Sequence, residues 1–189
     1  MATEREIKLP LPPDLEPIRR QLRKLQFRPS KARIFEANVL FDTADERLRT
    51  QGELLRIRTE NSTTLLSYKG VPKPGKYKNR EELETHLDDP KAFTQILGRL
   101  GFQPGFRYEK YRTEYTHSAQ PGIVMLDETP IGNYLEIEGG ARWIDQTAKL
   151  LGFSQPDYVT KSYGGLYLEY CQQRGIPPAN MVFGRKKKP

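Results

Sequence analysis

The sequence predicts a mainly β fold with flanking helices (α+β), built around a closed eight-stranded antiparallel β-barrel. Strand-like runs dominate the chain and mostly follow one another through short turns, whereas helical periodicity is confined to a few short segments. Several of these runs carry charge at every second position, as Glu4, Glu6 and Lys8 do in TEREIKLP. Because side chains alternate between the two faces of a strand, such charges share one face. The main question is whether these faces lie toward solvent or toward the interior of the barrel.

Proline, glycine and residue spacing divide the first half of the chain. Pro10 ends the first strand-like run, and apolar residues at helical spacing follow Asp14, which is a suitable capping residue. Gly52 closes a short helical turn, and Asn61-Ser62 has the form of a hairpin turn. These signals predict a strand at residues 3–9, a helix from about 14 to 26, a strand at 33–42, a helical turn at 44–51 and strands at 53–60 and 63–70.

The second half begins with a loop that is similar to part of a phosphate-binding loop. Residues 70–76, GVPKPGK, fit the pattern GxxxxGK, but Tyr77 stands where a hydroxyl residue is required, and two prolines remove amide donors. We therefore interpret this segment as a mobile hairpin loop at the barrel mouth. Its lysines, Lys73, Lys76 and Lys78, could attract a nucleotide, but solvated side chains are the favoured interpretation. Spacing then predicts strands at 78–87, 106–117, 123–128 and 134–138, and helices at 91–100, 141–151 and 160–172.

Composition and charge restrict the class of protein. The 189 residues are typical of a single domain, predicted over residues 1–175, with a basic tail at 176–189. The net charge of +7 includes four basic residues of the final GRKKKP, so the body of the chain is only mildly basic. A single cysteine, Cys171, excludes an intramolecular disulfide, and no apolar run is long enough to cross a membrane. We expect a cytoplasmic protein without membrane or nucleic-acid partners, and we leave a homodimer open.

The charged faces of the strands are predicted to line the interior of the barrel. For any single strand, an outward charged face would be the better interpretation. The opposite faces are apolar, however, as Ile7 with Leu9 and Leu135 with Ile137 show, and amphipathic helices are available to cover them. In addition, acids gather on the first and last strands, and bases gather on strands between them. The prediction is a tunnel with a polar, charged lumen.

A charged lumen requires ligands of both signs. Several converging Lys and Arg side chains favour a polyanion, and the planar guanidinium matches phosphate oxygens. Several carboxylates favour a hard divalent cation, because their pKa values must otherwise rise. A triphosphate that carries Mg²⁺ or Mn²⁺ satisfies both requirements. His86 and His117 are isolated in the sequence, so any chemistry would depend on metal and charge rather than on a covalent nucleophile.

A set of short motifs runs in order along residues 1–172. It begins with EREIKL and continues with FDT, GELLRIR, SYKG, REELE, EKYR, LDETPIGNYLEIEG and KSYGGL. In this order the motifs resemble the CYTH superfamily, the triphosphate tunnel metalloenzymes, whose N-terminal signature is ExExK. The resemblance implies that residues 1–175 form an eight-stranded antiparallel tunnel. It also implies a nucleoside triphosphate or another triphosphate-bearing substrate, bound with Mg²⁺ or Mn²⁺.

The resemblance assigns roles to individual residues. The metal-binding positions would be Glu4, Glu6, Asp127, Glu136 and Glu138. The triphosphate-binding positions would be Lys8, Arg56, Arg58, Lys69, Arg80, Lys110, Arg112 and Lys161. Catalysis would fall to Glu4, Glu6, Lys110, Arg112 and Glu136. Lys161 is the basic residue expected to close the tunnel, and the direction of the Arg80 side chain is left open.

Two reactions fit such a site. A class IV adenylate cyclase converts ATP to cyclic AMP and pyrophosphate, whereas a triphosphatase hydrolyses inorganic triphosphate or thiamine triphosphate. The chain length, GELLRIR and KSYGGL look most like the class IV cyclase-like branch of the family, so the cyclase is the first prediction. A third alternative is a non-catalytic module that binds polyphosphate or nucleotide, although the presence of all five acids argues against it.

Overall fold

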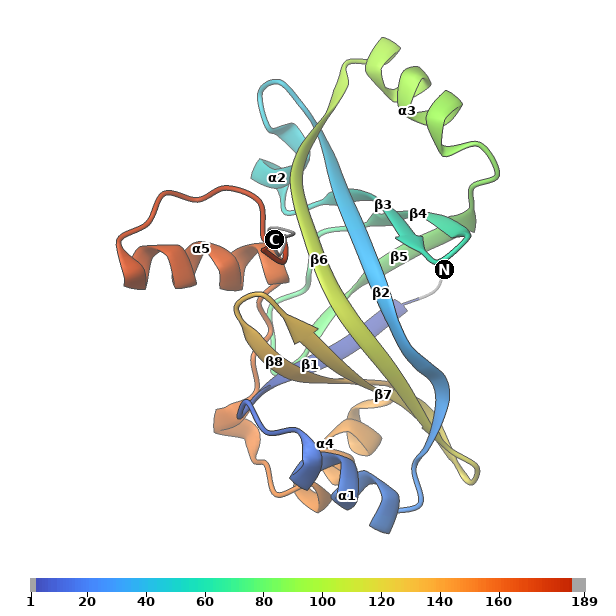
Figure 1. Cartoon of the computed structure of the whole chain (residues 1–189), viewed down its shortest axis with the longest axis vertical. Coiled ribbons are helices and arrows are strands. Elements are labelled where there is room, and N and C mark those ends of the chain that lie inside the picture. Colours follow the sequence, from blue (N-terminus) through green and yellow to red (C-terminus); the bar gives the residue numbers. More distant parts are fainter. Residues whose placement is uncertain (1–2, 185–189) are drawn as a thin grey trace, which may run out of the picture.

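The strands of the protein form a closed antiparallel barrel, as the sequence predicts. The computed structural model describes residues 3–184, and its ring order is β1-β5-β4-β3-β2-β6-β7-β8, after which β8 pairs with β1 (Figure 1). The strands are β1 (Thr3–Leu11), β2 (Arg28–Thr43), β3 (Leu54–Glu60), β4 (Thr63–Lys69), β5 (Lys78–His86), β6 (Phe102–His117), β7 (Gln120–Thr129) and β8 (Gly132–Glu138). The fold class is therefore confirmed as mainly β, with flanking helices outside a closed barrel.

Two of the five described α-helices, α1 and α4, cover the apolar outer face of β1 and β8. The α-helices are α1 (Glu16–Lys24), α2 (Arg47–Gln51), α3 (Pro90–Arg99), α4 (Ala141–Leu150) and α5 (Tyr163–Arg174). Helices α1 and α4 lie together below the barrel in Figure 1 and belong to one core cluster with the outward side chains of β1 and β8. Ile7, Leu135 and Ile137 are fully buried in this cluster. Burying this face leaves the alternate, charged positions of the same strands to point inward.

The largest differences from the expected boundaries lie in the two longest strands. Strand β2 begins at Arg28 rather than at residue 33, and β6 begins at Phe102 rather than at residue 106. Both extensions contain a proline, Pro29 and Pro104, which is a poor signal for a strand. Register shifts interrupt the β2–β6 pairing in both regions, and such bulges accommodate a residue that cannot donate to the ladder.

The segment after α5 turns back onto the barrel. The Met181 amide donates to the Arg107 carbonyl, and the Glu109 amide donates to the Met181 carbonyl, each at 2.9 Å. Met181 is buried in a cluster that includes Cys171, which is itself fully buried. The described part of the expected tail is therefore attached to β6, and residues 185–189 lie outside the described residues. None of the described helices has both the length and the apolar character that crossing a membrane requires.

The Trp143 ring of α4 packs closely against Gly122 of β7, and this contact gives a prediction about stability. Gly122 has φ +140°, and a Cβ atom there would lie 2.5 Å from the Trp143 ring. We expect Gly122→Ala to lower the free energy of unfolding by about 1–3 kcal/mol, because the ring must move. Urea unfolding measures this loss. Gly132→Ala is the matched control, since Gly132 has φ +136° but no atom within 4 Å of the added Cβ; equal losses would contradict the packing explanation.

Candidate functional site

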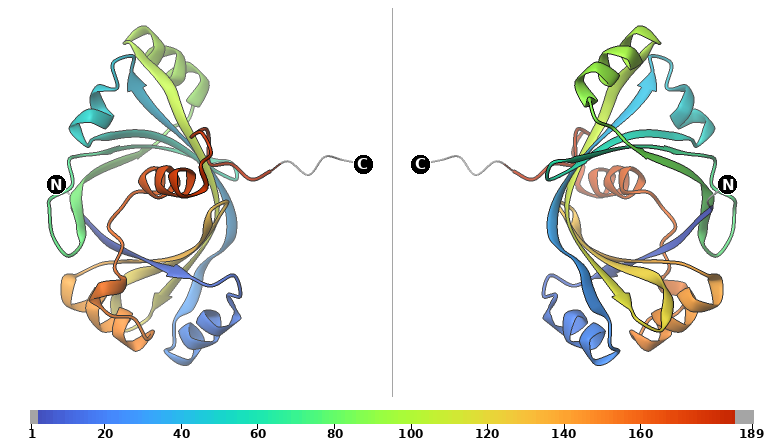
Figure 2. Two further views of the ribbon diagram at one scale, coloured as in Figure 1. Left: turned by 90° about the vertical axis from the view of Figure 1, so that its left-hand side faces the viewer. Right: turned by 90° about the vertical axis from the view of Figure 1, so that its right-hand side faces the viewer.

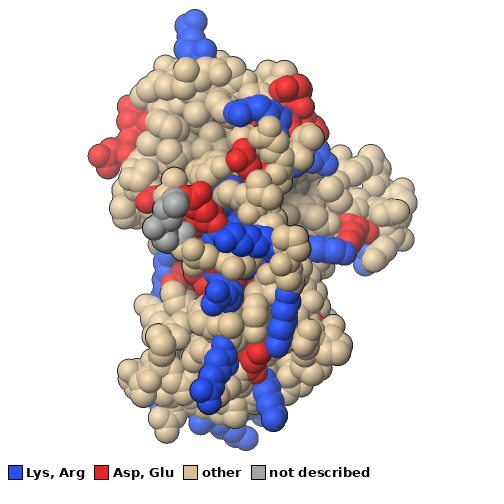
Figure 3. Space-filling view, turned by 180° about the vertical axis from the view of Figure 1, so that it is seen from behind, with Lys and Arg blue, Asp and Glu red and all other residues tan. Residues whose placement is uncertain are grey.

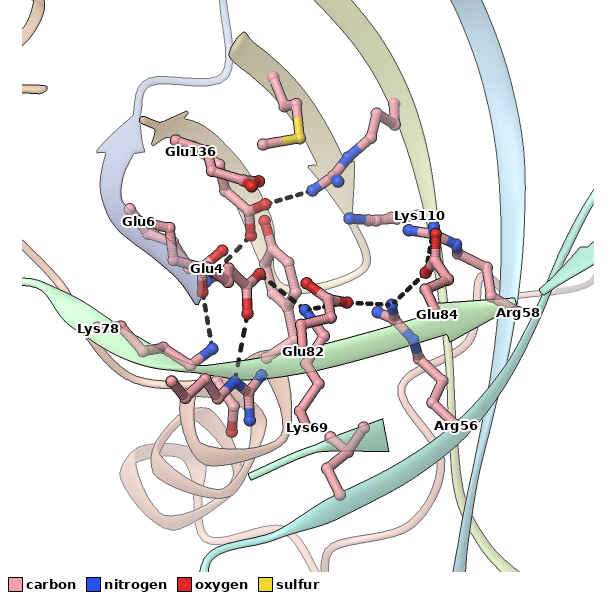
Figure 4. A pocket seen from close by; sticks show the side chains of 18 of the residues that line it. Glu4, Glu6, Arg56, Arg58, Lys69, Lys78, Glu82, Glu84, Lys110 and Glu136 are labelled. Atoms are coloured by element: carbon pink, nitrogen blue, oxygen red, sulfur yellow. Dashed lines mark hydrogen bonds and ion pairs between the residues drawn. The ribbon is translucent and has the colours of Figure 1, made fainter. Parts of the chain in front are cut away.

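The charged faces of the strands meet in a cavity of about 520 Å³ inside the barrel. Glu4, Glu6 and Lys8 of β1 all line it, so the first strand does present its charges inward, as predicted. Figure 4 shows Glu4 and Glu6 among the charged side chains of this cavity. Their position follows from the pairing of β1, which places Glu6 beside Glu138 on β8 and beside Lys78 on β5. The side chains of alternate residues on both neighbouring strands therefore reach the same space.

Bases and acids line this cavity in nearly equal numbers. Eight basic residues line it: Lys8, Arg56, Arg58, Lys69, Lys78, Arg80, Lys110 and Arg112. Seven acidic residues line it: Glu4, Glu6, Glu82, Glu84, Glu114, Glu136 and Glu138. Basic and acidic side chains also lie close together around the middle of the face seen in Figure 3. Almost equal numbers of both signs allow so many charges to share one interior.

Ion pairs connect the acids of β1 to lysines of β1, β4 and β5. Lys69 Nζ lies 2.7 Å from a Glu4 oxygen and 2.9 Å from a Glu82 oxygen. Lys78 Nζ and Lys8 Nζ both lie 2.7 Å from the same oxygen of Glu6. Because these groups are hardly exposed to solvent, their interactions are little screened, and each charge depends on its partners.

Further pairs connect the bases to β8 and to β1. Lys8 Nζ lies 3.1 Å from a Glu136 oxygen, and Arg112 donates to the same carboxylate. Arg80 points inward, which resolves its direction, and its Nε donates to Glu4 at 3.3 Å. These contacts connect every cavity-facing charge of β1 to at least one opposite charge on another strand.

The pKa values show which charges are compensated. Burial alone would raise the pKa of Glu6, but Lys8 and Lys78 outweigh it and hold that pKa well below the usual range. Burial together with the nearby Lys8 charge lowers the pKa of Lys78 to about 8. Burial also raises the pKa of Glu138 to about 7, and the negative charges of Glu4 and Glu6 raise it further. Glu138 therefore carries the least compensated charge of this group.

The acid-rich side, which we define as Glu4, Glu6, Glu136 and Glu138, fits a hard divalent cation. Within residues 3–184, no group of three or more acidic, histidine or cysteine side chains already surrounds an ion position. Lysine ammonium groups lie between the carboxylates instead, and Glu138 has no ion-pair partner among the described residues. Because carboxylate oxygens are the ligands that Mg²⁺ and Mn²⁺ accept, these four residues could hold such an ion once lysines are drawn to another anion.

Asp127 is placed differently from the other predicted metal ligands. It is fully buried and does not line the cavity. Its carboxylate accepts from Arg112 Nε at 2.6 Å, from Lys110 Nζ at 3.0 Å and from the Tyr163 hydroxyl at 2.6 Å. A second Arg112 nitrogen also donates to it at 2.6 Å, and a carboxylate that accepts four hydrogen bonds has little capacity left for a metal. These contacts favour a supporting role, in which Asp127 orients the two bases toward the cavity.

Lys161 also differs from its predicted role. It does not line the cavity, and its exposed side chain pairs with Glu169 of α5. The adjacent residues Ser162, Tyr163 and Gly164 line the cavity instead. The Tyr163 ring lies 5.3 Å from Lys8 Nζ and 5.2 Å from Lys110 Nζ. The KSYGGL segment therefore reaches the cavity through its tyrosine rather than its lysine.

Sequence reasoning missed several residues of the site. The expectation that Lys78 is solvated was wrong, because β5 begins at this residue and turns its side chain into the cavity. Glu36 and Asn38 of β2 are buried beside the bases, and none of their side-chain polar atoms has a hydrogen-bond partner in the described structure. Lys110 and Arg112 lie near Glu36 and outweigh its burial, so its pKa falls to about 2. The spacing of Glu36, Asn38 and Leu40 at every second position could have predicted that these side chains share the inward face of β2.

Comparison with known proteins places this architecture among proteins of one family. A family model described as the CYTH domain matches residues 2–163. The "Putative adenylate cyclase MJ0240" of Methanocaldococcus jannaschii is 31% identical over 171 residues, which cover 85% of this chain and 95% of that protein.

Solved structures share the fold at lower sequence identity. A "putative adenylate cyclase" from Vibrio parahaemolyticus matches with a TM-score of 0.74 and 18% identity, covering 89% of this chain and 97% of that one. A "putative adenylyl cyclase" from Hippeastrum, described as having a dominant triphosphatase activity, matches with a TM-score of 0.64 and 20% identity over 94% and 98% of the two chains. With the family model matching most of its length, the chain belongs to the CYTH domain family.

Proposed function

We propose that the protein is an enzyme that binds a triphosphate-bearing substrate together with Mg²⁺ or Mn²⁺ inside the barrel. The first candidate reaction is that of a class IV adenylate cyclase, which forms cyclic AMP and pyrophosphate from ATP. The observation that carries the proposal is the convergence of eight basic residues on one cavity that also contains the acid-rich side, where Glu138 is the least compensated carboxylate. Family membership and the name of the Methanocaldococcus relative support it.

The charge balance of the cavity favours joint binding of metal and triphosphate. A triphosphate alone would draw Lys8, Lys69 and Lys78 from their carboxylate partners and leave those acids unpaired. A cation alone would occupy the acids and leave the lysines unpaired. Leaving either set buried without partners is costly, so each ligand strengthens the binding of the other.

The residues of the cavity supply orientation and charge for the reaction. Lys8, Lys69, Arg56 and Arg58 lie around the cavity where they would bind phosphate oxygens, and Arg112 is held in place by Asp127. When bound, the metal would supply further charge neutralisation at the phosphates and at the leaving group. In the cyclase reaction, the ribose 3′-hydroxyl attacks the α-phosphorus, and the bases stabilise the departing pyrophosphate. Alignment for in-line attack would provide much of the rate enhancement.

A triphosphatase is the second candidate, because the Hippeastrum protein with the same fold is described as mainly a triphosphatase. In that reaction water attacks the terminal phosphorus, and the same bases hold the chain of phosphates. The two reactions differ in which phosphorus meets the nucleophile, so the products distinguish them.

The test is to identify products with Mg²⁺ or Mn²⁺ and, separately, ATP, thiamine triphosphate and inorganic triphosphate. We expect cyclic AMP and pyrophosphate in equal amounts from ATP. Orthophosphate release would replace the cyclase by a triphosphatase. Metal-dependent binding without turnover would leave only a binding module, and absence of binding would refute the proposed function.

A further inference from the structure

Arg56 differs from the other bases of the charged cavity in the groups that hold it. A carboxylate oxygen lies within 3.3 Å of a side-chain nitrogen in each of the other seven, which are Lys8, Arg58, Lys69, Lys78, Arg80, Lys110 and Arg112. For Arg56 the carboxylate oxygens of Glu84 and Glu82 lie at 3.7 and 3.8 Å, which is beyond hydrogen-bond distance (Figure 4). Among the described side chains of this cavity, Arg56 is therefore the one base that no carboxylate holds by a hydrogen bond.

Two neutral hydroxyl groups hold Arg56 instead. One of its terminal nitrogens donates to the Tyr108 hydroxyl at 3.2 Å, and the other donates to the Ser67 hydroxyl at 3.1 Å. Arg56 and Tyr108 are both buried, so water has little access to these contacts. The two hydroxyls fix the direction of the planar guanidinium and leave its positive charge available to an anion.

The Tyr108 hydroxyl keeps an unused donor. A guanidinium has no acceptor atom, so the Tyr108 oxygen accepts from Arg56 and the hydroxyl hydrogen remains free. Within residues 3–184, Arg56 is the one hydrogen-bond partner of this hydroxyl. Ser67 differs, because its hydroxyl donates to Glu84 at 2.7 Å. A buried donor without an acceptor is costly, so an acceptor that reaches Tyr108 would remove this cost.

The neighbours of Tyr108 do not accept this hydrogen. Helix α5 lies across one opening of the barrel (Figure 2), and its Tyr163 ring lies 6.2 Å from the Tyr108 ring. The Tyr163 hydroxyl, however, donates to Asp127. Asn38 is the register partner of Tyr108 on β2, and its side chain makes no hydrogen bond in the described structure. Since Tyr108 lines the charged cavity, its acceptor would come from a ligand in that cavity.

A hydroxyl at this position suits a phosphate oxygen. A carboxylate beside Arg56 would compete with an anion for the guanidinium, whereas a hydroxyl accepts from the guanidinium and donates to the anion at the same time. Burial alone would raise the pKa of Tyr108, but the charges of Arg56 and Lys110 outweigh it and lower that pKa below its ordinary value. The same two charges make the hydroxyl a stronger donor to an anionic oxygen.

We propose that Tyr108 is a phosphate-binding residue of this cavity, which fixes Arg56 and donates its hydroxyl hydrogen to an oxygen of the phosphate group that Arg56 binds. The inference rests on the proposed function, because it requires phosphate in the charged cavity. It adds a neutral donor to a set of phosphate-binding residues that are otherwise basic.

The first test removes the hydroxyl and keeps the ring. Tyr108→Phe retains the packing of the ring on Phe106, at 5.9 Å between centroids, so the variant is expected to fold. We expect the dissociation constant of imidotriphosphate in the presence of Mg²⁺, measured by calorimetry, to rise about tenfold. Tyr115→Phe is the matched control, because Tyr115 is equally buried on β6 but belongs to the outer core cluster, and it should leave the dissociation constant unchanged.

The second test separates contact with phosphate from the support of Arg56. Arg56→Met removes the guanidinium, and the seven remaining bases retain binding of imidotriphosphate with Mg²⁺. If Tyr108 contacts phosphate, adding Tyr108→Phe to this variant should weaken binding again, by about threefold or more. If Tyr108 only held Arg56, the second substitution would have no effect, and this result would overturn the inference.

The outcomes for the inference and for the proposed function can be told apart. Thermal unfolding establishes that each variant is folded. Unchanged binding in folded Tyr108→Phe, or equal losses in Tyr108→Phe and Tyr115→Phe, would overturn the inference and leave the proposed function standing. Absence of metal-dependent binding of any triphosphate by the unmodified protein would remove the proposed function and the inference with it.

Discussion

Glu138→Gln is expected to lower metal-dependent turnover about a hundredfold or more while making the metal-free protein more stable. Glu138 has no ion-pair partner among the described residues, and burial with the charges of Glu4 and Glu6 raises its pKa to about 7. Above that pH, the ionised carboxylate is repelled by its neighbours in the folded state. Glutamine removes this repulsion, but it also removes a charged oxygen that we propose as a metal ligand on the acid-rich side.

The pH dependence of stability follows from the same shift. The pKa of Glu138 in the folded protein lies above its pKa in the unfolded chain. The contribution of Glu138 to the free energy of unfolding is therefore fully present below the unfolded-chain pKa and is lost as the pH rises through about 7. Thermal unfolding without metal should therefore show the largest gain for Glu138→Gln near pH 8. Glu128→Gln is the control, because Glu128 pairs with the half-exposed Arg33. Normal activity in Glu138→Gln, or a loss of stability at pH 8, would contradict the assignment.

Asp127→Asn is expected to act mainly on stability and to lower the free energy of unfolding by about 3–5 kcal/mol. The variant removes the carboxylate that accepts from Arg112, Lys110 and Tyr163, and it leaves two buried cations with weaker partners. The loss of unfolding free energy is large because a buried charge without a charged partner is costly.

Urea unfolding measures this loss, and the metal dependence of the remaining activity tests the role of Asp127. We expect the metal concentration for half-maximal activity to stay unchanged if Asp127 only supports the bases. Asp145→Asn is the matched control, because Asp145 also accepts from three side chains but lies at the surface; its loss should be much smaller. A stable Asp127→Asn protein with a raised metal requirement would restore Asp127 as a metal ligand.

The inward direction of the charged side chains was predictable from the sequence, because charged residues recur at every second position of the strands. Glu4, Glu6 and Lys8 alternate with apolar residues, and the apolar side needed a cover that α1 and α4 provide. The same alternation also places Arg56 and Arg58 in the cavity. Barrel closure followed from the number of strands, although the pairing of β1 with β5 and of β2 with β6 joins strands that no local turn connects.

Several features of the site depend on three-dimensional contacts that no local pattern contains. Asp127 lies on the inward face of β7 with Ile123 and Met125. Only the contacts with Tyr163 of α5 and with two bases of β6 show that its carboxylate oxygens already accept hydrogen bonds. Lys161 and Tyr163 are two residues apart, and from the sequence the charged Lys161 was the residue predicted to reach the cavity. Lys78 follows a segment whose proline and glycine content is typical of a loop. Only the register of β1 against β5 shows that its side chain contacts Glu6.

Closure of the barrel has a consequence for the order of folding. Strand β1 completes the ring only when it pairs with β5 and β8, and Glu6 meets Glu138 across that last seam. Such contacts span most of the chain, so loop-closure entropy opposes them until the other strands have assembled. Until then β5 and β8 are unpaired edges of the open sheet, and edges of this kind invite association between molecules unless charged side chains discourage it. We therefore expect ring closure to be the late, slow step of folding, with the charges destined for the cavity keeping the open sheet from aggregating.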